Sequence, residues 1–292
     1  MTNNSSVAQT VTLNSGNKVP ILAFGTAAPF LGKDCSNAIL QALRAGFWHI
    51  DTAQLYGNQE YVGKALSLWE GKREEVYITA KWGLDGGEKN DPRKALEETL
   101  SKMGVEYIDM FLMHSPITIS PLSIAEAWSI METLQEEGKC IDIGISNFGA
   151  TDIRELCKTW KVIPAINQIE FSPYNAHDPL SKACVKACEE HGIAVSGFGC
   201  LQPLSLSDPP LPLNPILHKL CGEKGSTPGQ VLLRWAQQEM SGTVVTTTSQ
   251  PHRMHEDVEA FDRPLLTDEE MEEIRKVGEG RYYRRYLDPF RP

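Results

Sequence analysis

The 292-residue sequence lacks the long apolar run that a membrane-spanning helix needs. No hydrophobic stretch approaches the ~20 residues that cross a bilayer. The first residues, Met-Thr-Asn-Asn-Ser-Ser, also lack the basic stretch followed by an apolar one that makes a secretory signal. These absences favour a cytoplasmic protein that does not bind membranes.

Paired cysteines and an excess of positive charge are missing as well. The seven cysteines include no Cys-x-x-Cys pair, so we interpret them as reduced thiols of a cytosolic protein and expect no metal site. Cys184 and Cys188 lie one helical turn apart, a spacing more typical of packing than of ligation. The net charge is −10, whereas nucleic-acid binding usually shows a basic stripe. We therefore expect no nucleic-acid partner.

Two glycine-rich nucleotide motifs are also absent. The chain contains neither Gly-x-Gly-x-x-Gly nor Gly-x-x-x-x-Gly-Lys-Ser/Thr. An open α/β sheet that binds a dinucleotide usually has the first motif after its first strand. The absence favours a closed barrel over an open sheet, and an anionic cofactor would then need a local basic or backbone-amide site.

The sequence does contain a strand-like apolar run followed by a segment of helical period, repeated eight times. Strands are expected at Ile21–Gly25, Trp48–Asp51, Val76–Lys81, Tyr107–His114, Ile141–Ser146, Ala165–Ile169, Ala194–Gly197 and Thr243–Thr246. Helices are expected at Asp34–Ala45, Gln59–Trp69, Asp91–Met103, Ser123–Glu137, Ala150–Trp160, Pro179–His191, Thr227–Glu239, Pro251–Glu259 and Thr267–Val277. Alternating strands and helices imply parallel pairing through right-handed crossovers. The pattern predicts one α/β domain over residues 1–292, a (β/α)8 TIM barrel, which typically takes about 250 residues.

The two ends of the chain are expected to cover the two mouths of this barrel. Thr10–Leu13 and Lys18–Pro20 flank a polar turn, which predicts a β-hairpin within residues 1–20 that caps the bottom. A loop rich in Pro and Leu is expected at Gln202–Pro215. Residues 279–292 are predicted to be a C-terminal tail, either frayed or folded over the opposite mouth.

Ionisable residues end three successive strands. Asp51, Lys81 and His114 close the second, third and fourth strands, and Tyr56 follows Asp51 in the next loop. The C-terminal ends of parallel barrel strands share one rim, where the chemistry of such barrels takes place. A lysine ammonium roughly 4 Å from a phenol contributes about 4 kcal/mol at an effective dielectric constant of about 20, or roughly three pKa units.

The four residues could therefore donate a proton to a carbonyl oxygen as a hydride reaches its carbon. We expect Lys81 to lower the pKa of Tyr56, the proton donor, far enough for that step. Asp51 would keep the lysine charged, and His114 would orient the carbonyl group.

Each of these residues also has an ordinary structural explanation. Asp51 could cap a turn, Tyr56 could be a loop aromatic, Lys81 a solvated charge and His114 a core histidine. Their joint occurrence at one end of three strands favours catalysis. A hydrolytic pair of Asp51 and Glu170 is a further alternative, but it leaves the lysine and the tyrosine unexplained.

Long segments of the chain also resemble a known enzyme family. Gly46–Glu60 resembles the first signature of the aldo-keto reductases, and residues within Met131–Phe148 resemble the second. Ile78–Trp82 and Phe111–His114 resemble the segments that carry the family's lysine and histidine. The resemblance implies a (β/α)8 barrel that reduces carbonyl groups with NADPH, and sometimes NADH. The implied catalytic tetrad is Asp51, Tyr56, Lys81 and His114.

The resemblance also implies a cofactor groove. Ser146, Asn147 and Gln168 would hold the nicotinamide carboxamide, and Phe198 would replace the usual stacking tyrosine. Without the resemblance, Ser146-Asn147 would be interpreted as a turn or helix cap, and Phe198 as core packing. The implied cofactor residues are Gly25, Thr26, Asp51, Ser146, Asn147, Gln168, Phe198, Cys200, Leu201, Thr247, Thr248, Ser249, Arg253 and Glu256.

The adenosine end departs from the family pattern. Thr247 stands where the family often has lysine, although Arg253 is retained. NADPH is favoured over NADH because an arginine guanidinium binds phosphate through two hydrogen bonds.

Aromatic side chains are expected to wall an apolar substrate pocket, although each could instead belong to the core. The candidates beside Tyr56 and His114 are Phe30, Leu31, Trp82, Tyr282, Tyr283 and Tyr286. Such a pocket suits small hydrophobic aldehydes and ketones. Similarity to fungal members points to activated ketones such as keto-lactones, keto esters and diketones. The alternative is an accessory subunit that binds NADPH with little turnover. The protein is expected to be a monomer or weak dimer.

Overall fold

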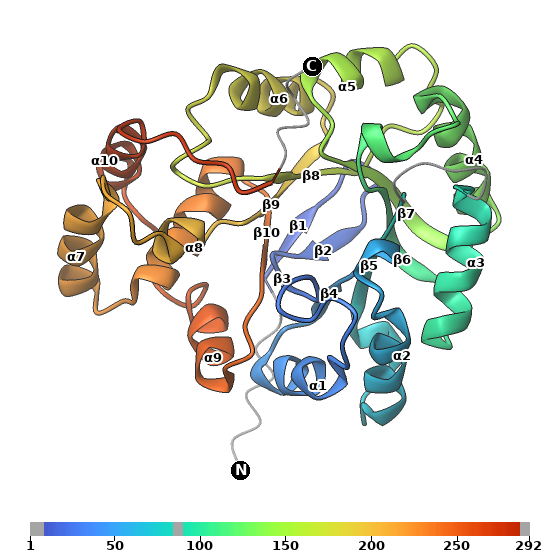
Figure 1. Cartoon of the computed structure of the whole chain (residues 1–292), viewed down its shortest axis with the longest axis horizontal. Helices are drawn as coiled ribbons and strands as arrows, with labels where there is room; N and C mark the ends of the chain where they lie inside the picture. Colours follow the sequence, from blue (N-terminus) through green and yellow to red (C-terminus); the bar gives the residue numbers. More distant parts are fainter. Residues whose placement is uncertain (1–8, 84–89, 287–292) are drawn as a thin grey trace.

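The chain forms a closed barrel of parallel strands surrounded by helices (Figure 1). The structure is a computed structural model that describes residues 9–83 and 90–286. The strands follow the order β10-β3-β4-β5-β6-β7-β8-β9 around the barrel, and each neighbouring pair is parallel. The predicted α/β fold, a (β/α)8 barrel, is confirmed.

The elements lie close to the predicted ranges. The barrel strands are β3 (Leu22–Gly25), β4 (His49–Asp51), β5 (Tyr77–Trp82), β6 (Ile108–Met113), β7 (Cys140–Ser146), β8 (Ile166–Glu170), β9 (Ala194–Phe198) and β10 (Thr243–Thr246). The helices are α1 (Ser36–Ala45), α2 (Gln59–Leu68), α3 (Pro92–Met103), α4 (Ile124–Glu136), α5 (Ala150–Leu156), α6 (Pro179–Glu190), α7 (Leu213–Lys224), α8 (Pro228–Met240), α9 (Pro251–Glu259) and α10 (Asp268–Gly278). Short 3-10 helices are η1 (Gln54–Tyr56), η2 (Arg73–Glu75), η3 (Pro116–Thr118) and η4 (Gln202–Ser205). Across the described residues, no helix has the length and apolar character needed to cross a membrane.

The start and end of α3 show how local sequence sets these bounds. The Asp91 carboxylate accepts hydrogen bonds from the backbone amides of Arg93 at 2.8 Å and Lys94 at 3.3 Å, with Pro92 in the first turn. Gly104 ends the helix with φ of +65°, a left-handed conformation that favours glycine. Both signals are legible in the sequence.

Helix α7 was not predicted, and its first residues fall in the loop that was expected at Gln202–Pro215. The helix begins at Leu213, and Leu213, Ile216, Leu217 and Leu220 form its buried face. Pro215 falls in the first turn, where a missing backbone N–H costs no helical hydrogen bond. The proline-rich segment before it concealed an otherwise regular helical period.

The predicted hairpin closes one end of the barrel. Strands β1 (Thr10–Thr12) and β2 (Lys18–Pro20) pair antiparallel, with Val11 opposite Val19. One buried cluster joins the hairpin to the barrel and comprises Leu13, Val19, Met110, Leu112, Ala165 and Ile166. The part of the hairpin region at residues 1–8 and the part of the tail at 287–292 lie outside the described residues.

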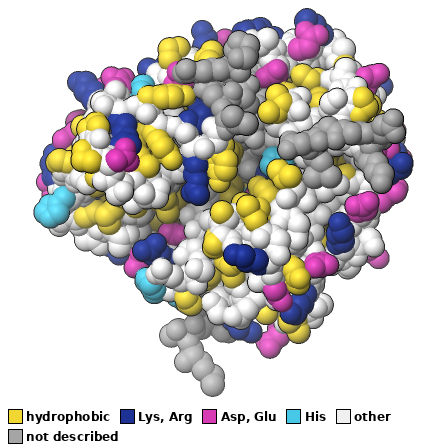
Figure 2. Space-filling view, in the orientation of Figure 1, with side chains coloured by type: hydrophobic (Ala, Val, Ile, Leu, Met, Phe, Trp, Pro, Cys, Tyr) yellow, Lys and Arg dark blue, Asp and Glu magenta, His cyan; other side chains and the backbone are white. Residues whose placement is uncertain are grey.

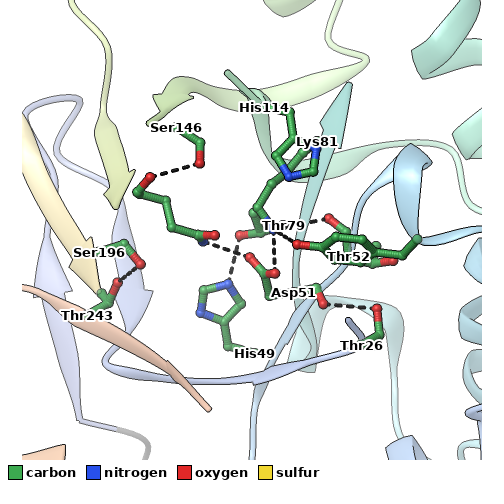
Figure 3. Close-up of polar contacts among 12 residues, drawn as sticks. Thr26, His49, Asp51, Thr52, Thr79, Lys81, His114, Ser146, Ser196 and Thr243 are labelled. Carbon is green, nitrogen blue, oxygen red and sulfur yellow. Dashed lines mark hydrogen bonds and ion pairs between the residues drawn. The ribbon is translucent and has the colours of Figure 1, made fainter. Parts of the chain in front are cut away.

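Polar side chains line the barrel interior between the hairpin and the opposite rim, and they pair with one another (Figure 3). His49 Nε2 lies 2.8 Å from Thr79 Oγ1, and the Thr243 hydroxyl donates to Ser196 Oγ at 2.8 Å. Pairing avoids the cost of burying unsatisfied polar groups. This interior forms a fixed floor beneath the rim that carries the tetrad.

Candidate active site

The barrel topology brings the four predicted catalytic residues together. Asp51 ends β4, Lys81 lies near the end of β5, and His114 directly follows β6. Tyr56 ends η1, in the connection from β4 to α2. Asp51 and Lys81 are only 2% and 1% exposed, so the site is a buried cluster rather than a surface patch.

The centre of this cluster is an ion pair between Lys81 and Asp51. The ammonium donates to Asp51 Oδ1, and both side chains are buried (Figure 3). Burial opposes the charged lysine, but attraction to Asp51 and contact with Tyr56 outweigh it and raise the pKa of Lys81 above its ordinary value. The lysine therefore remains positively charged within the core.

Tyr56 lies next to this charge, with its hydroxyl oxygen 3.3 Å from Lys81 Nζ. The pKa of Tyr56 is nevertheless raised, because burial of the phenol outweighs the attraction of Lys81. Lys81 does lower this pKa, as expected, but in the free protein its effect is too small to bring the pKa of Tyr56 below the ordinary value. Part of the lysine's field is offset by Asp51, which itself raises the pKa of the phenol. Tyr56 thus carries its proton at neutral pH.

His114 packs against Tyr56 as a neutral imidazole. The two rings meet edge to face, with centroids 5.7 Å apart. Burial, assisted by the charge of Lys81, lowers the pKa of His114 to about 3. Its Nδ1 is buried and has no hydrogen-bond partner among the described residues. A neutral imidazole can donate one hydrogen bond without competing with Tyr56 as an acid.

A second set of side chains surrounds the ion pair. Gln168 Nε2 donates to Asp51 Oδ2 at 2.8 Å, while the Ser146 hydroxyl donates to the Gln168 backbone oxygen at 2.8 Å. Asn147, in a left-handed conformation with φ of +59°, donates from Nδ2 to the backbone oxygen of His114 at 2.9 Å. The predicted carboxamide residues are thus tied to the tetrad, a link that the sequence did not reveal.

The loop after β3 is fixed to the same rim. The Thr26 hydroxyl donates to the Asp51 backbone oxygen at 3.2 Å. Asn58, fully buried, donates from Nδ2 to the backbone oxygens of Thr26 at 2.7 Å and Phe30 at 3.0 Å. Asn58 stands within the segment that resembles the first family signature, but it was not among the predicted site residues.

The predicted phosphate residues lie at the junction of β10 and α9. Thr247, Ser249 and Arg253 are exposed, and no side chain caps the start of α9. An uncapped helix start beside an arginine and hydroxyl groups suits a phosphate group. Asp257, one turn after Arg253, is buried, and this burial raises its pKa to about 7. This carboxyl therefore competes with a bound phosphate for Arg253 less strongly than an ordinary ionised aspartate would.

The remaining predicted cofactor residues follow the rim between these two regions. Gly25 ends β3, where an added Cβ would lie 3.1 Å from Val245 Cγ1. Phe198 ends β9 and is partly exposed, and Leu201 follows it in the next connection. Cys200 is buried, and burial raises the pKa of its thiol to about 12. Glu256 is half-buried on α9.

Two sequence interpretations do not fit their positions. Trp82 is fully buried, and its Nε1 donates to Met131 Sδ on α4 at 3.1 Å. Because successive strand residues face opposite sides, Trp82 points away from the barrel interior that Lys81 faces, which contradicts its predicted substrate contact. The Glu170 carboxylate accepts hydrogen bonds from the backbone of the C-terminal tail, so it does not pair with Asp51.

The sequence and the fold of this chain are both similar to those of known proteins. A sequence model of the Aldo/keto reductase family matches residues 22–279. The NADPH-dependent alpha-keto amide reductase of Saccharomyces cerevisiae is 35% identical over 288 residues, covering 92% of this chain and 91% of that protein. The NAD/NADP-dependent indole-3-acetaldehyde reductase of Schizosaccharomyces pombe is 36% identical over 284 residues, covering 93% and 96%. The crystal structure of Bombyx mori AKR2E4 in complex with NADP matches with a TM-score of 0.81 at 30% identity, covering 92% of each chain.

Proposed function

Because the chain belongs to the aldo/keto reductase family, we propose that it reduces aldehydes or ketones to alcohols with NADPH, using Tyr56 as the proton donor. The observation that carries this proposal is the buried, charged Lys81 with the protonated Tyr56 hydroxyl 3.3 Å from its Nζ. A proton donor must hold its proton until the substrate needs it. A raised pKa for Tyr56 meets that requirement across the neutral range.

Each member of the tetrad has a separate part in the reaction. The nicotinamide, when bound, supplies the hydride to the carbonyl carbon. Tyr56 passes the proton on its hydroxyl oxygen to the carbonyl oxygen, and Lys81 stabilises the phenolate that develops. Asp51 keeps the lysine charged, and the neutral His114 donates a hydrogen bond that orients the carbonyl group.

The residues around the tetrad fit an NADPH molecule. The Gln168 amide donates from Nε2 to Asp51, which leaves its carbonyl oxygen to accept from the carboxamide nitrogen, and Ser146 and Asn147 lie alongside. The partly exposed Phe198 offers a ring for stacking. At the far end, Thr247, Thr248, Ser249 and Arg253 would hold the phosphate that distinguishes NADPH from NADH.

The substrate side of the rim is apolar. Three hydrophobic residues lie exposed in the connections after β3, β4 and β6: Leu31 at 50%, Leu55 at 50% and Ile117 at 65%. Figure 2 shows hydrophobic side chains gathered around a hollow near the centre of the molecule. Phe30 and Tyr283 are partly buried and pack against the hydrophobic core, and both are proposed to contribute to the wall of the pocket. These features support small apolar substrates, and activated ketones such as keto esters, keto-lactones and diketones are the proposed class.

The proposed cellular setting is the reducing cytosol, with a monomer or weak dimer as the working form. All seven cysteines lie in the described part of the chain and are free thiols, which agrees with a reducing compartment. Gel filtration across a range of protein concentrations tests the oligomeric state.

A steady-state assay tests the function. We expect purified protein to oxidise NADPH in the presence of activated ketones, and Tyr56→Phe to lower kcat by about 10² to 10⁴, as is typical for loss of a general acid. NADPH binding, measured by tryptophan fluorescence, should be similar in both proteins. Unchanged turnover in Tyr56→Phe would falsify the proton-donor role. Absence of turnover with intact NADPH binding would favour the accessory-subunit alternative.

A further inference from the structure

The segment that follows α10 crosses the rim of the barrel that carries the tetrad. Figure 1 shows it running from α10 toward β8 and β9. The described part ends at Tyr286. The backbone N–H of Tyr283 donates to the backbone oxygen of Tyr174 at 3.0 Å, which docks the middle of this tail. The tail is therefore docked at a defined position, and its further contacts extend to the proposed nicotinamide site.

The end of the tail is held by one buried carboxylate. Glu170, the last residue of β8, is 2% exposed. Its Oε1 accepts from the backbone N–H of Arg285 at 2.7 Å, and its Oε2 accepts from that of Tyr286 at 3.1 Å. Hydrogen bonds to an ionised acceptor are stronger than neutral ones. Both carboxylate oxygens of Glu170 are thus committed to the tail.

Phe198, which lies beside Glu170 in the barrel, is the residue proposed to stack against the nicotinamide. Glu170 of β8 is the register partner of Phe198 of β9. The Tyr286 ring meets the Phe198 ring edge to face, with centroids 5.7 Å apart. Burial is the main cause of the raised pKa of Tyr56, and the Tyr286 phenol adds a minor electrostatic contribution.

The tail is also tied to the connection that follows β9. Arg281 donates from Nη1 to the backbone oxygens of Asp208 at 2.6 Å and Pro210 at 2.7 Å, and it forms an ion pair with the Asp208 carboxylate at 3.0 Å. Burial raises the pKa of the Glu170 carboxyl, and the backbone N–H groups of Arg285 and Tyr286 and, to a smaller extent, the Gln202 side chain in the same connection oppose that shift. Arg281 therefore joins the tail directly to this connection, and Gln202 of the connection acts on the same carboxylate that holds the end of the tail.

We propose that Glu170 is a positioning residue that fixes the C-terminal tail and the connection after β9 on the rim, and so holds Tyr286 beside Phe198. This proposal rests on the proposed function, because it assigns Phe198 to the nicotinamide. Glu170 touches neither the hydride nor the proton that moves. Its effect is on how firmly the cofactor is retained, since two segments that border the nicotinamide site are anchored through its carboxylate.

The substitution Glu170→Gln separates positioning from chemistry. A glutamine keeps the size of the side chain but has one acceptor oxygen, and its amide nitrogen would face a backbone N–H. We expect the Kd for NADPH to rise by about tenfold, because cofactor binding would then have to order a tail that has lost a charge-assisted hydrogen bond of about that energy. The single-turnover rate of hydride transfer at saturating NADPH and ketone should stay within about threefold of the wild-type rate.

The matched control is Glu132→Gln on α4. Glu132 Oε1 also accepts from two successive backbone amides, those of Lys161 at 2.6 Å and Val162 at 2.9 Å. Loss of this arrangement should affect stability but not NADPH affinity. A change in affinity that is equal in both variants would mean that general destabilisation is responsible, and would overturn the proposal.

Limited proteolysis gives a readout that needs no catalysis. The tail contains three arginines after which trypsin can cleave, Arg281, Arg284 and Arg285. We expect Glu170→Gln to be cut there faster than wild type and Glu132→Gln, as followed by mass spectrometry. Equal cleavage in all three proteins would overturn the proposal, as would tighter NADPH binding by Glu170→Gln, because the tail would then compete with the cofactor. A wild-type protein that binds NADPH but reduces no carbonyl would contradict the proposed function while leaving this test intact.

Discussion

The two ends of the proposed cofactor groove differ in how much of their polar structure exists before a ligand binds. At the tetrad, Lys81 pairs with Asp51, Gln168 donates to Asp51, and both charged groups are almost completely buried. At the phosphate end, Thr247 and Arg253 are exposed. The reacting end is therefore preorganised, whereas the phosphate end depends on groups that water still solvates.

This difference has a physical consequence. Fixed charges in a water-poor site act strongly and need no rearrangement during the reaction. Exposed charges are screened by water and salt, so they contribute affinity rather than rate. Substitutions at the two ends should therefore change different quantities, and that separation can be measured.

The largest expected effect is at the buried ion pair. Lys81→Met leaves the Asp51 carboxylate buried without its partner, which should lower the free energy of unfolding by about 3–5 kcal/mol and also slow the reaction. Lys64→Met is the matched control, because Lys64 pairs with Asp34 at 2.7 Å on the surface, where such pairs contribute about 0–1 kcal/mol. Urea unfolding of both variants measures the difference. Similar losses would contradict the contrast between buried and exposed charge.

The second largest effect is expected from acid, which acts on two buried histidines. Burial lowers the pKa of His49 to about 4 and of His114 to about 3, whereas an unfolded histidine titrates at about 6.5. Below that pH the unfolded chain binds protons that the folded chain does not, so the free energy of unfolding falls as pH falls. The slope should reach about 1.4 kcal/mol per pH unit for each histidine. Unfolding curves between neutral and mildly acidic pH test this, and His114→Gln should reduce the slope.

The smallest of these effects is expected at the phosphate end. Arg253→Ala should raise the Kd for NADPH by about tenfold, since a hydrogen bond to a charged group contributes about 1.5–3 kcal/mol, and should leave NADH binding nearly unchanged. The difference between wild type and variant should shrink as salt is added. Fluorescence titrations with both cofactors measure it. Equal weakening of NADPH and NADH would show that Arg253 does not bind the phosphate.

Much of the fold and the tetrad could be predicted because the determining signals are local. Three successive strands carry an ionisable residue at or next to the C-terminal end, and parallel topology brings these ends together. The position of Trp82 was also predictable, because strand alternation places it opposite Lys81. The prediction failed there because an aromatic residue next to the catalytic lysine suits a pocket wall as well as a core, and only the strand face distinguishes the two.

Other features depend on the folded environment and leave no local signal. The direction of the Tyr56 pKa shift is set by burial, which competes with Lys81 only once the barrel closes. The contact between Glu170 and the tail joins residues 115 positions apart. Neither could be derived from residue types and spacing alone.

The central claim is that the buried Lys81–Asp51 pair supports a Tyr56 that holds its proton at neutral pH. The most direct test is the pH dependence of single-turnover hydride transfer from NADPH to a ketone. Because the pKa of Tyr56 is raised and that of His114 is about 3, the rate should stay constant across the neutral range and fall only at alkaline pH. A fall centred near neutral pH would contradict the claim and show that Lys81 dominates over burial.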